Sequence, residues 1–155
     1  ISNKNSSKVL FLNEHGLTSS LSVLNSKNKY LKYKAILFGR KLKGMIKDEI
    51  IVKTATLNQI IIKNKLPNID LLKIDTEGHE LEVLLGIGKN IKKIKYILVE
   101  IHNDTIYKNY NPKKIHNFLI KNNFSLKRTF KFPFTTWEDR IYSNKTKNEH
   151  SRASS

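Results

Sequence analysis

The sequence predicts an α/β fold built on a sheet with parallel core strands and a C-terminal antiparallel hairpin. Two segments, Ile69–Asp75 and Tyr96–Ile101, are almost continuously apolar, which is typical of strands buried on both faces of a parallel sheet. A segment with helical spacing follows each of them, and a short turn around Pro133 separates the last two strand-like segments. Strands that alternate with helices in this way indicate a sheet covered by helices.

The N-terminal third is less regular. Residues 8–12 (KVLFL) and 49–53 (EIIVK) are rich in β-branched, aliphatic or aromatic side chains and are predicted to be strands. Residues 13–22 are rich in turn-forming side chains. Residues 23–47 show no clean period, so we expect irregular structure with some helix there. In total, about five strands are expected in the sheet.

The helices between the strands have recognisable ends. Thr56 followed by Gln59 forms a Thr-x-x-Gln capping box, which predicts a helix of about two turns that ends before Pro67. Residues 80–85 (ELEVLL) place three leucines on one helical stripe, and Gly86 is predicted to end that helix.

The C-terminal third contains one helix and the hairpin. Asn111 is expected to cap a helix that Pro112 opens, because proline is well tolerated at the first helical position. Residues 124–131 and 137–143 are predicted to pair as antiparallel strands. Residues 144–155 are polar and are expected to form a disordered tail, so that the domain spans residues 1–143.

Composition limits the possible functions. The chain has 155 residues, the length of one domain, and contains no cysteine. That absence excludes disulfides, zinc–thiolate sites, iron–sulfur clusters and a cysteine nucleophile. No apolar run in the sequence approaches the roughly 20 residues of a membrane span. We therefore expect a cytoplasmic protein without a membrane span.

The charge is strongly positive without being clustered. There are 29 Lys and Arg residues against 13 Asp and Glu, a formal net charge of +16 at pH 7. The lysines are scattered along the chain, whereas a nucleic-acid footprint is usually clustered and rich in arginine. We expect no specific nucleic-acid partner, although a basic binding module without catalytic activity remains an alternative.

Polar side chains follow the two apolar strands, where a ligand site is expected. Ligands of open α/β sheets bind beyond the carboxyl ends of the strands. Asp75 ends one strand and Glu100 nearly ends the next, so their backbones would lie roughly 5 Å apart in adjacent strands. Glu77 and His79 follow in the first loop, and His102 follows in the second. We expect these five side chains to share one pocket.

Other roles for these residues stay open. Asp75 and Glu77 precede a helix, where a carboxylate can cap free N–H groups. His79 and His102 could be exposed polar side chains, because single histidines carry no spacing information. No metal site is expected, since the sequence lacks His-x-x-x-His or a similar ligand spacing. It also contains no glycine-rich phosphate loop and no nucleophile elbow.

Three segments together resemble the C-terminal half of the FkbM family of S-adenosylmethionine-dependent methyltransferases. They are residues 52–60 (VKTATLNQI), residues 69–86, which contain LLKIDTEGHELEVLLG, and residues 97–101 (ILVEI). Residues 16–21 (GLTSSL) and 139–142 (DRIY) also match the family's ordering. The resemblance covers roughly residues 9–143, and the combination is more specific than any one motif.

The resemblance implies a Rossmann-like class I methyltransferase sheet. It also implies transfer of a methyl group from S-adenosylmethionine to an oxygen atom of a sugar or another small hydroxylated acceptor. The family's motif residues correspond to Asp75, Glu77-Gly78 and Glu100. We expect Asp75 or Glu77 to be the catalytic base, and His79, Glu100 and His102 to bind the acceptor. His79 and His102 are alternative bases.

The family's glycine-rich cofactor loop has no counterpart in this sequence and would precede Ile1. The chain also begins without Met, and its first core strand would leave a long apolar edge, which folded proteins avoid. We therefore expect an N-terminally truncated sheet, with the residues that bind the cofactor unknown. An inactive fragment on a methyltransferase scaffold is a second alternative.

Overall fold

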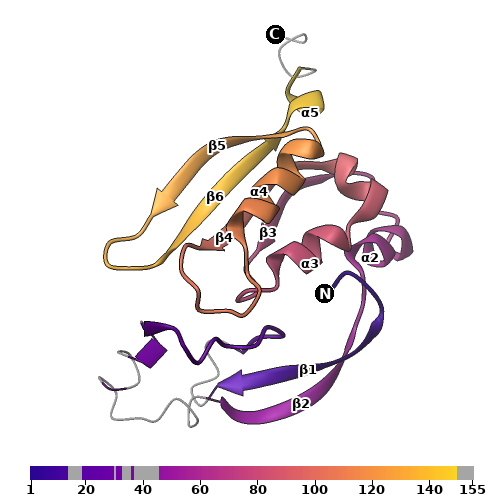
Figure 1. Cartoon of the computed structure of the whole chain (residues 1–155). Helices are drawn as coiled ribbons and strands as arrows, with labels where there is room; N and C mark the ends of the chain where they lie inside the picture. The colour runs from indigo at the N-terminus through magenta and orange to yellow at the C-terminus, as the bar shows by residue number, and fades with distance from the viewer. Residues whose placement is uncertain (14–18, 30, 33–35, 37–45, 150–155) are drawn as a thin grey trace.

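The computed structural model describes residues 1–13, 19–29, 31–32, 36 and 46–149, which form two sheets and the helices around them (Figure 1). The smaller sheet pairs β1 (Ser6–Asn13) with β2 (Ile46–Thr54). The larger sheet contains β3 (Ile69–Ile74), β4 (Ile94–His102), β5 (Phe124–Lys131) and β6 (Trp137–Asn144). The helices are α2 (Leu57–Lys63), α3 (Glu80–Leu85), the 3₁₀-helix η2 (Gly88–Lys93), α4 (Pro112–Lys121) and α5 (Lys145–Glu149).

The larger sheet is mixed and has the strand order β3-β4-β6-β5. β3 and β4 are parallel, with Ile74 opposite Val99. β6 pairs antiparallel with both β4 and β5. The predicted α/β class is confirmed and the C-terminal strands pair as expected, but among the described residues only one strand pair of this sheet is parallel.

The strand predicted at residues 49–53 does not join the larger sheet. It lies within β2, which pairs with β1 from Ser6 opposite Thr54 to Leu12 opposite Asp48. The expected sheet of about five strands is therefore wrong for the described residues. The β1–β2 ribbon instead lies below the loops that follow β3 and β4, with residues 19–28 between (Figure 1).

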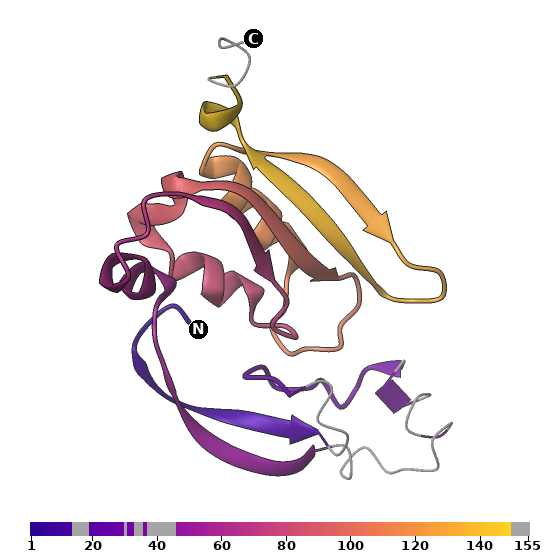
Figure 2. The same cartoon turned by 180° about the vertical axis from the view of Figure 1, so that it is seen from behind.

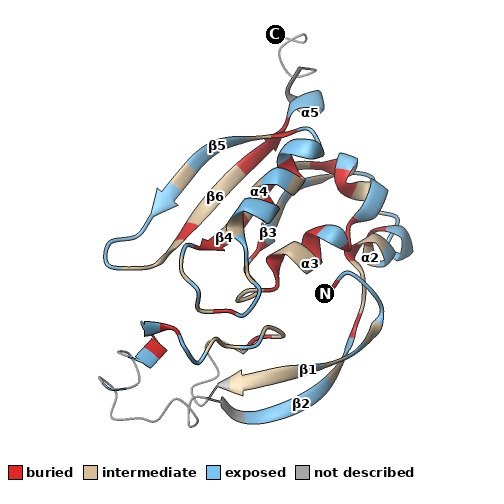
Figure 3. Ribbon diagram, in the orientation of Figure 1, coloured by how far each residue is buried: buried red, intermediate tan, exposed pale blue. Residues whose placement is uncertain are grey.

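The helices α3 and α4 cover one face of the larger sheet (Figure 1). On β4 the side chains that face them, Ile97, Val99 and Ile101, are fully buried. They pack in one cluster with further buried residues of the sheet and helices: Ile74, Val83, Leu84, Ile115, Leu119 and Tyr142. Figure 3 shows this buried layer between helices and sheet. Full burial of an aliphatic side chain stabilises the fold by roughly 1.5–3 kcal/mol, so this layer is the core.

The opposite face of the sheet has no described helix over it (Figure 2). Leu71 on β3 is 52% exposed and Lys73 is exposed, whereas Ile74 is buried. Successive residues of a strand point to opposite faces, so one side of β3 meets the core and the other meets solvent. The prediction that Ile69–Asp75 is buried on both faces is therefore wrong for the described structure.

The predicted helix starts are confirmed. α2 follows Thr56, whose hydroxyl accepts a hydrogen bond from the Gln59 N–H at 3.2 Å. α4 follows Asn111, whose side-chain oxygen accepts from the Lys113 N–H at 3.0 Å, and Pro112 is its first residue. Both caps satisfy N–H groups that have no partner within the helix.

The segment expected to be a disordered tail is ordered at its start. Asn144 ends β6 and is buried, and its side-chain amide donates to the Ile94 carbonyl at 3.1 Å. Lys145–Glu149 forms α5, and the Lys147 ammonium donates to the Lys93 carbonyl at 2.8 Å. The carbonyl groups of Lys93 and Ile94 thus fix residues 144–149 in place. Composition alone does not reveal these contacts. Residues 150–155 lie outside the described residues.

Two further expectations concern helices. The irregular segment with some helix expected at residues 23–47 lies partly outside the described residues, and of the described ones 29, 31–32 and 36 are helical. Within the described part of the chain, no helix has the length and apolar character needed to cross a membrane.

Candidate active site

Asp75 and Glu100 lie on neighbouring strands at the carboxyl ends of β3 and β4. The parallel register ends with Ile74, the last residue of β3, opposite Val99, and Asp75 and Glu100 are the residues that come next. Asp75 is exposed and accepts a hydrogen bond from the Lys73 ammonium at 2.9 Å. Glu100 is largely buried, with 13% of its side chain exposed. The two carboxylates therefore share one edge of the sheet.

Glu77, Glu100 and His102 form a tighter group at this edge, which we call the carboxylate–histidine cluster. The Nε2 atom of His102 lies 3.1 Å from Oε1 of Glu100 and 3.9 Å from Oε2 of Glu77. One side-chain O or N atom from each of the three residues lies within 4.8 Å of the other two. Glu100 and His102 are two residues apart on β4, so their side chains point to the same face of the sheet. Glu77 comes from the loop between β3 and α3.

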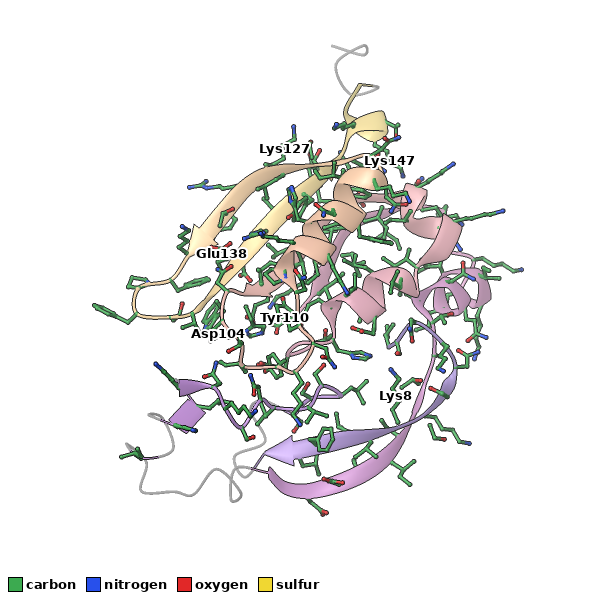
Figure 4. All side chains as sticks on the ribbon, in the orientation of Figure 1. Lys8, Asp104, Tyr110, Lys127, Glu138 and Lys147 are labelled. Atoms are coloured by element: carbon green, nitrogen blue, oxygen red, sulfur yellow. The ribbon has the colours of Figure 1, made fainter. Side chains whose placement is uncertain are left out.

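Two tyrosines from the loop after β4 form a wall of the cluster. The Tyr107 hydroxyl donates to Oε2 of Glu77, and its ring lies edge-to-face against His102 with centroids 5.0 Å apart. Tyr110, labelled in Figure 4, also meets the His102 ring edge-to-face, at 5.6 Å, and its hydroxyl accepts from the backbone N–H of His102. Burial, together with nearby carboxylates, raises the pKa of both tyrosine hydroxyls, so both stay protonated.

The loop that carries Glu77 has an uncommon backbone conformation. Glu77 and Gly78 both have positive φ, 54° and 92°, and this region costs a non-glycine residue roughly 1–2 kcal/mol. The fully buried Glu80 stabilises the turn, because its Oε1 accepts from the N–H groups of Thr76 and Gly78 at 3.0 Å each. The capping role considered for Asp75 and Glu77 is not observed in the described structure, because His79 is the N-cap residue of α3 and no side chain caps it.

Residues 19–28, which we call the serine strap, cross both loops of the site. The Ser20 hydroxyl donates to the Glu77 carbonyl at 2.5 Å, and the Ser22 hydroxyl donates to the Gly78 carbonyl at 2.7 Å. The Asn25 N–H donates to the Ile106 carbonyl at 2.6 Å, within the loop that carries Tyr107. One segment that is distant in sequence therefore ties the two loops together.

Negative charge collects at this edge of the sheet. Asp139 on β6 pairs opposite Glu100, and burial together with the charge of Glu100 raises the pKa of Asp139. Burial by itself lowers the pKa of the His102 imidazole. The neighbouring carboxylates of Glu100, Glu80 and Glu77 raise it by more, so the pKa is raised overall. Within the described chain, no Lys or Arg forms a salt bridge with Glu77 or Glu100. The cluster therefore attracts cations although the whole chain is strongly positive.

His79 does not join the cluster. Its Nε2 lies 3.1 Å from the Ser2 hydroxyl and 3.4 Å from the Lys8 ammonium, and its Nδ1 lies 3.7 Å from Glu82. Burial lowers the pKa of His79. Figure 4 shows Lys8 on β1, well apart from Tyr110. The structure thus separates His79 from Glu100 and His102, the residues with which it was expected to bind the acceptor.

The fold and this edge describe an α/β protein with an acidic site at the ends of two parallel strands. The sequence matches the Methyltransferase FkbM domain over residues 2–131, and the chain belongs to this family. It is also similar to the hexuronic acid methyltransferase AglP of Haloferax volcanii, with 35% identity over 51 residues. That match covers 33% of this chain and 21% of the length of AglP. No solved structure matches the chain.

Several residues of the site were not found by sequence reasoning. Glu80 carries a weak signal, because a carboxylate in the first turn of a helix complements the free N–H groups there. Tyr107 and Tyr110 carry no spacing signal, since they reach the site from a loop. Ser20 lies in the GLTSSL stretch that resembles the family, but the stretch does not reveal which loop it contacts.

Proposed function

We propose that this protein is an S-adenosylmethionine-dependent methyltransferase that acts on an oxygen atom of a sugar or another small hydroxylated acceptor. The observation that carries the proposal is the contact between Glu100 and His102 on β4, with Asp75 following the neighbouring parallel strand β3, in a chain of the FkbM family. The name of the Haloferax relative, which specifies a hexuronic acid, supports a saccharide acceptor.

The acidic edge fits the charge of the proposed cofactor. When bound, S-adenosylmethionine supplies a methyl group on a positively charged sulfonium. The carboxylates of Glu100 and Asp139 would stabilise that charge, because they pair opposite one another on β4 and β6, where burial and the charge of Glu100 raise the pKa of Asp139. The sequence contains no glycine-rich nucleotide loop, so the assignment is limited to the sulfonium end of the cofactor.

The remaining chemistry is alignment of the acceptor and removal of its proton. A sugar hydroxyl is a weak acid, and a positioned general base typically contributes 10²- to 10⁴-fold to the rate. Asp75 and Glu77 are the two candidate bases. Each already accepts one hydrogen bond, Glu77 from the Tyr107 hydroxyl and Asp75 from the Lys73 ammonium. Asp75 is the more exposed of the two, which favours it. Glu100 and His102 would hold the acceptor by hydrogen bonds from the neighbouring strand.

The proposal is tested by methyl transfer from labelled S-adenosylmethionine to a panel of saccharides that includes uronic acids, with the products analysed for O-methyl groups. We expect acceptor-dependent incorporation of label. Asp75→Asn should lower kcat at least 100-fold and leave cofactor affinity nearly unchanged. Asp70→Asn, an exposed carboxylate near the other end of β3, is the matched control.

Two outcomes would count against the proposal at different levels. If the wild-type protein transfers no methyl group to any hydroxylated acceptor, the proposed activity is wrong. If Asp75→Asn keeps the wild-type kcat, the activity stands but Asp75 is not the base.

A further inference from the structure

We propose that Glu77, Glu100 and His102 bind one divalent metal cation through two carboxylate oxygens and the imidazole Nε2. Oxygen and nitrogen ligands lie about 2.0–2.2 Å from such an ion, so two ligands of the same ion are about 3–4 Å apart. The distances from Nε2 of His102 to the two carboxylates, 3.1 and 3.9 Å, fall in this range. All three ligand atoms lie within 4.8 Å of one another.

His102 provides a second, independent observation. The residue is only 4% exposed, and its Nδ1 has no hydrogen-bond partner among the described residues. Its Nε2 makes no well-aligned hydrogen bond there and lies beside two carboxylates, 3.1 Å from Glu100 and 3.9 Å from Glu77. Buried polar side-chain atoms are nearly always hydrogen-bonded, so this imidazole needs an explanation. A cation between the three side chains would be a partner for Nε2 and for both carboxylates.

The surrounding residues would orient the ligands. The Tyr107 hydroxyl donates to Oε2 of Glu77, and a carboxylate has enough lone pairs to accept this bond and still bind an ion. The rings of Tyr107 and Tyr110 meet His102 edge-to-face and limit rotation of its imidazole. Outer partners of this kind commonly fix metal ligands in place.

The charge distribution favours binding at this position over the rest of the chain. With a formal net charge of +16, most of the protein repels cations. At the cluster the two carboxylates have no Lys or Arg salt-bridge partner within the described residues. The chain has no cysteine, and a ligand set of two carboxylates and one imidazole suits Mn²⁺, Mg²⁺ or Zn²⁺.

The use of the ion rests on the proposed function, whereas its binding does not. Three protein ligands leave coordination positions open, and these would receive oxygen atoms of a hydroxylated acceptor. Glu77 would then serve as a metal ligand, which leaves Asp75 as the proton acceptor.

The test is a titration of the full chain with MnCl₂, in which the electron paramagnetic resonance signal of free aqueous Mn²⁺ reports the unbound ion. We expect one Mn²⁺ per chain. Glu100→Gln and His102→Gln should each weaken Mn²⁺ binding at least tenfold. Glu82→Gln makes the same change on α3, away from the cluster, and should leave the affinity unchanged. MgCl₂ is added as a competitor.

Nuclear magnetic resonance locates the ion. Substoichiometric Mn²⁺ should broaden the ring signals of Tyr107 and Tyr110 before those of Tyr142, which contacts His116 on the helix-covered face. If His102→Gln fails to fold, Glu77→Gln serves in its place, because 24% of the Glu77 side chain is exposed.

No Mn²⁺ binding at millimolar concentration would overturn the proposal. Binding that Glu100→Gln and Glu77→Gln leave unchanged, or broadening confined to other residues, would also overturn it. Mn²⁺ binding without methyl transfer would overturn the proposed function and leave the metal site standing.

Discussion

The ring of Tyr107 occupies the space that a β-carbon on residue 78 would need. A β-carbon built on Gly78 would lie within 2.9 Å of three ring carbons of Tyr107. Gly78 also has φ of +92°, a conformation that L side chains rarely adopt. The glycine therefore permits both the turn and the close approach of the tyrosine that donates to Glu77.

Gly78→Ala should destabilise the protein more than a glycine-to-alanine substitution at a position where a positive φ is the only obstacle. The backbone term is about 1–2 kcal/mol, and the clash with Tyr107 adds about 1–3 kcal/mol. Gly88→Ala is the matched control, because Gly88 has φ of +58° but, among the described residues, its β-carbon would meet only Asn58, at 3.6 Å. Urea unfolding of both variants measures the difference. Equal losses of unfolding free energy would mean that the approach of Tyr107 is easily relaxed.

Removing the two hydroxyls of the serine strap should loosen the Glu77 loop. Ser20→Ala and Ser22→Ala each delete a hydrogen bond to a backbone carbonyl, worth about 1 kcal/mol. Amide hydrogen exchange in residues 76–80 should accelerate more than exchange in β4, whose stability comes from the core. Ser26→Ala changes an exposed serine of the same strap and should have little effect. Unchanged exchange in the double variant would show that the strap does not hold the loop.

Glu80→Gln should alter the pH dependence of stability. Burial raises the pKa of Glu80 above its ordinary value of 4.5, so the folded state binds the proton more tightly than the unfolded state. The resulting stabilisation is present below the unfolded pKa and is lost as the pH rises through the raised folded pKa. Glu80→Gln removes this loss while keeping the oxygen that accepts from Thr76 and Gly78.

The stability of Glu80→Gln relative to wild type should therefore increase as the pH rises above the ordinary glutamate pKa of 4.5, measured by urea unfolding at each pH. Glu80→Ala, by contrast, deletes the acceptor and should be destabilised by about 2–4 kcal/mol at every pH. Parallel pH profiles for wild type and Glu80→Gln would contradict a raised pKa at this position.

Tyr107→Phe should separate orientation of Glu77 from packing against Gly78. The variant keeps the ring and loses only the hydroxyl that donates to Glu77. We expect kcat/KM for the acceptor to fall about tenfold, as for other partners that orient a site residue, with an unfolding free energy within about 1 kcal/mol of wild type. Tyr96→Phe, on the same face of β4 but near its other end, is the control. An unchanged kcat/KM would mean that Glu77 needs no fixed orientation.

Local signals predicted most of the individual elements. The start of α2 at Thr56 and the start of α4 at Asn111 and Pro112 depend on hydrogen bonds within a few residues, so a short stretch of sequence specifies them. Pairing between distant segments was not predictable in the same way. β2 pairs with β1 and does not join the larger sheet. The apolar β pattern of β2 is compatible with either partner, so the local sequence did not predict which one it would have.

The sequence by itself determined the family resemblance and the set of polar residues that follow the two core strands. His79 and His102 each come two residues after a glutamate, so the local sequence does not distinguish them. Tertiary structure decided between them. His102 lies on a strand, where alternate residues share a face, and so it meets Glu100. His79 comes after a turn with two positive φ angles, which directs it toward Ser2 and away from Glu100.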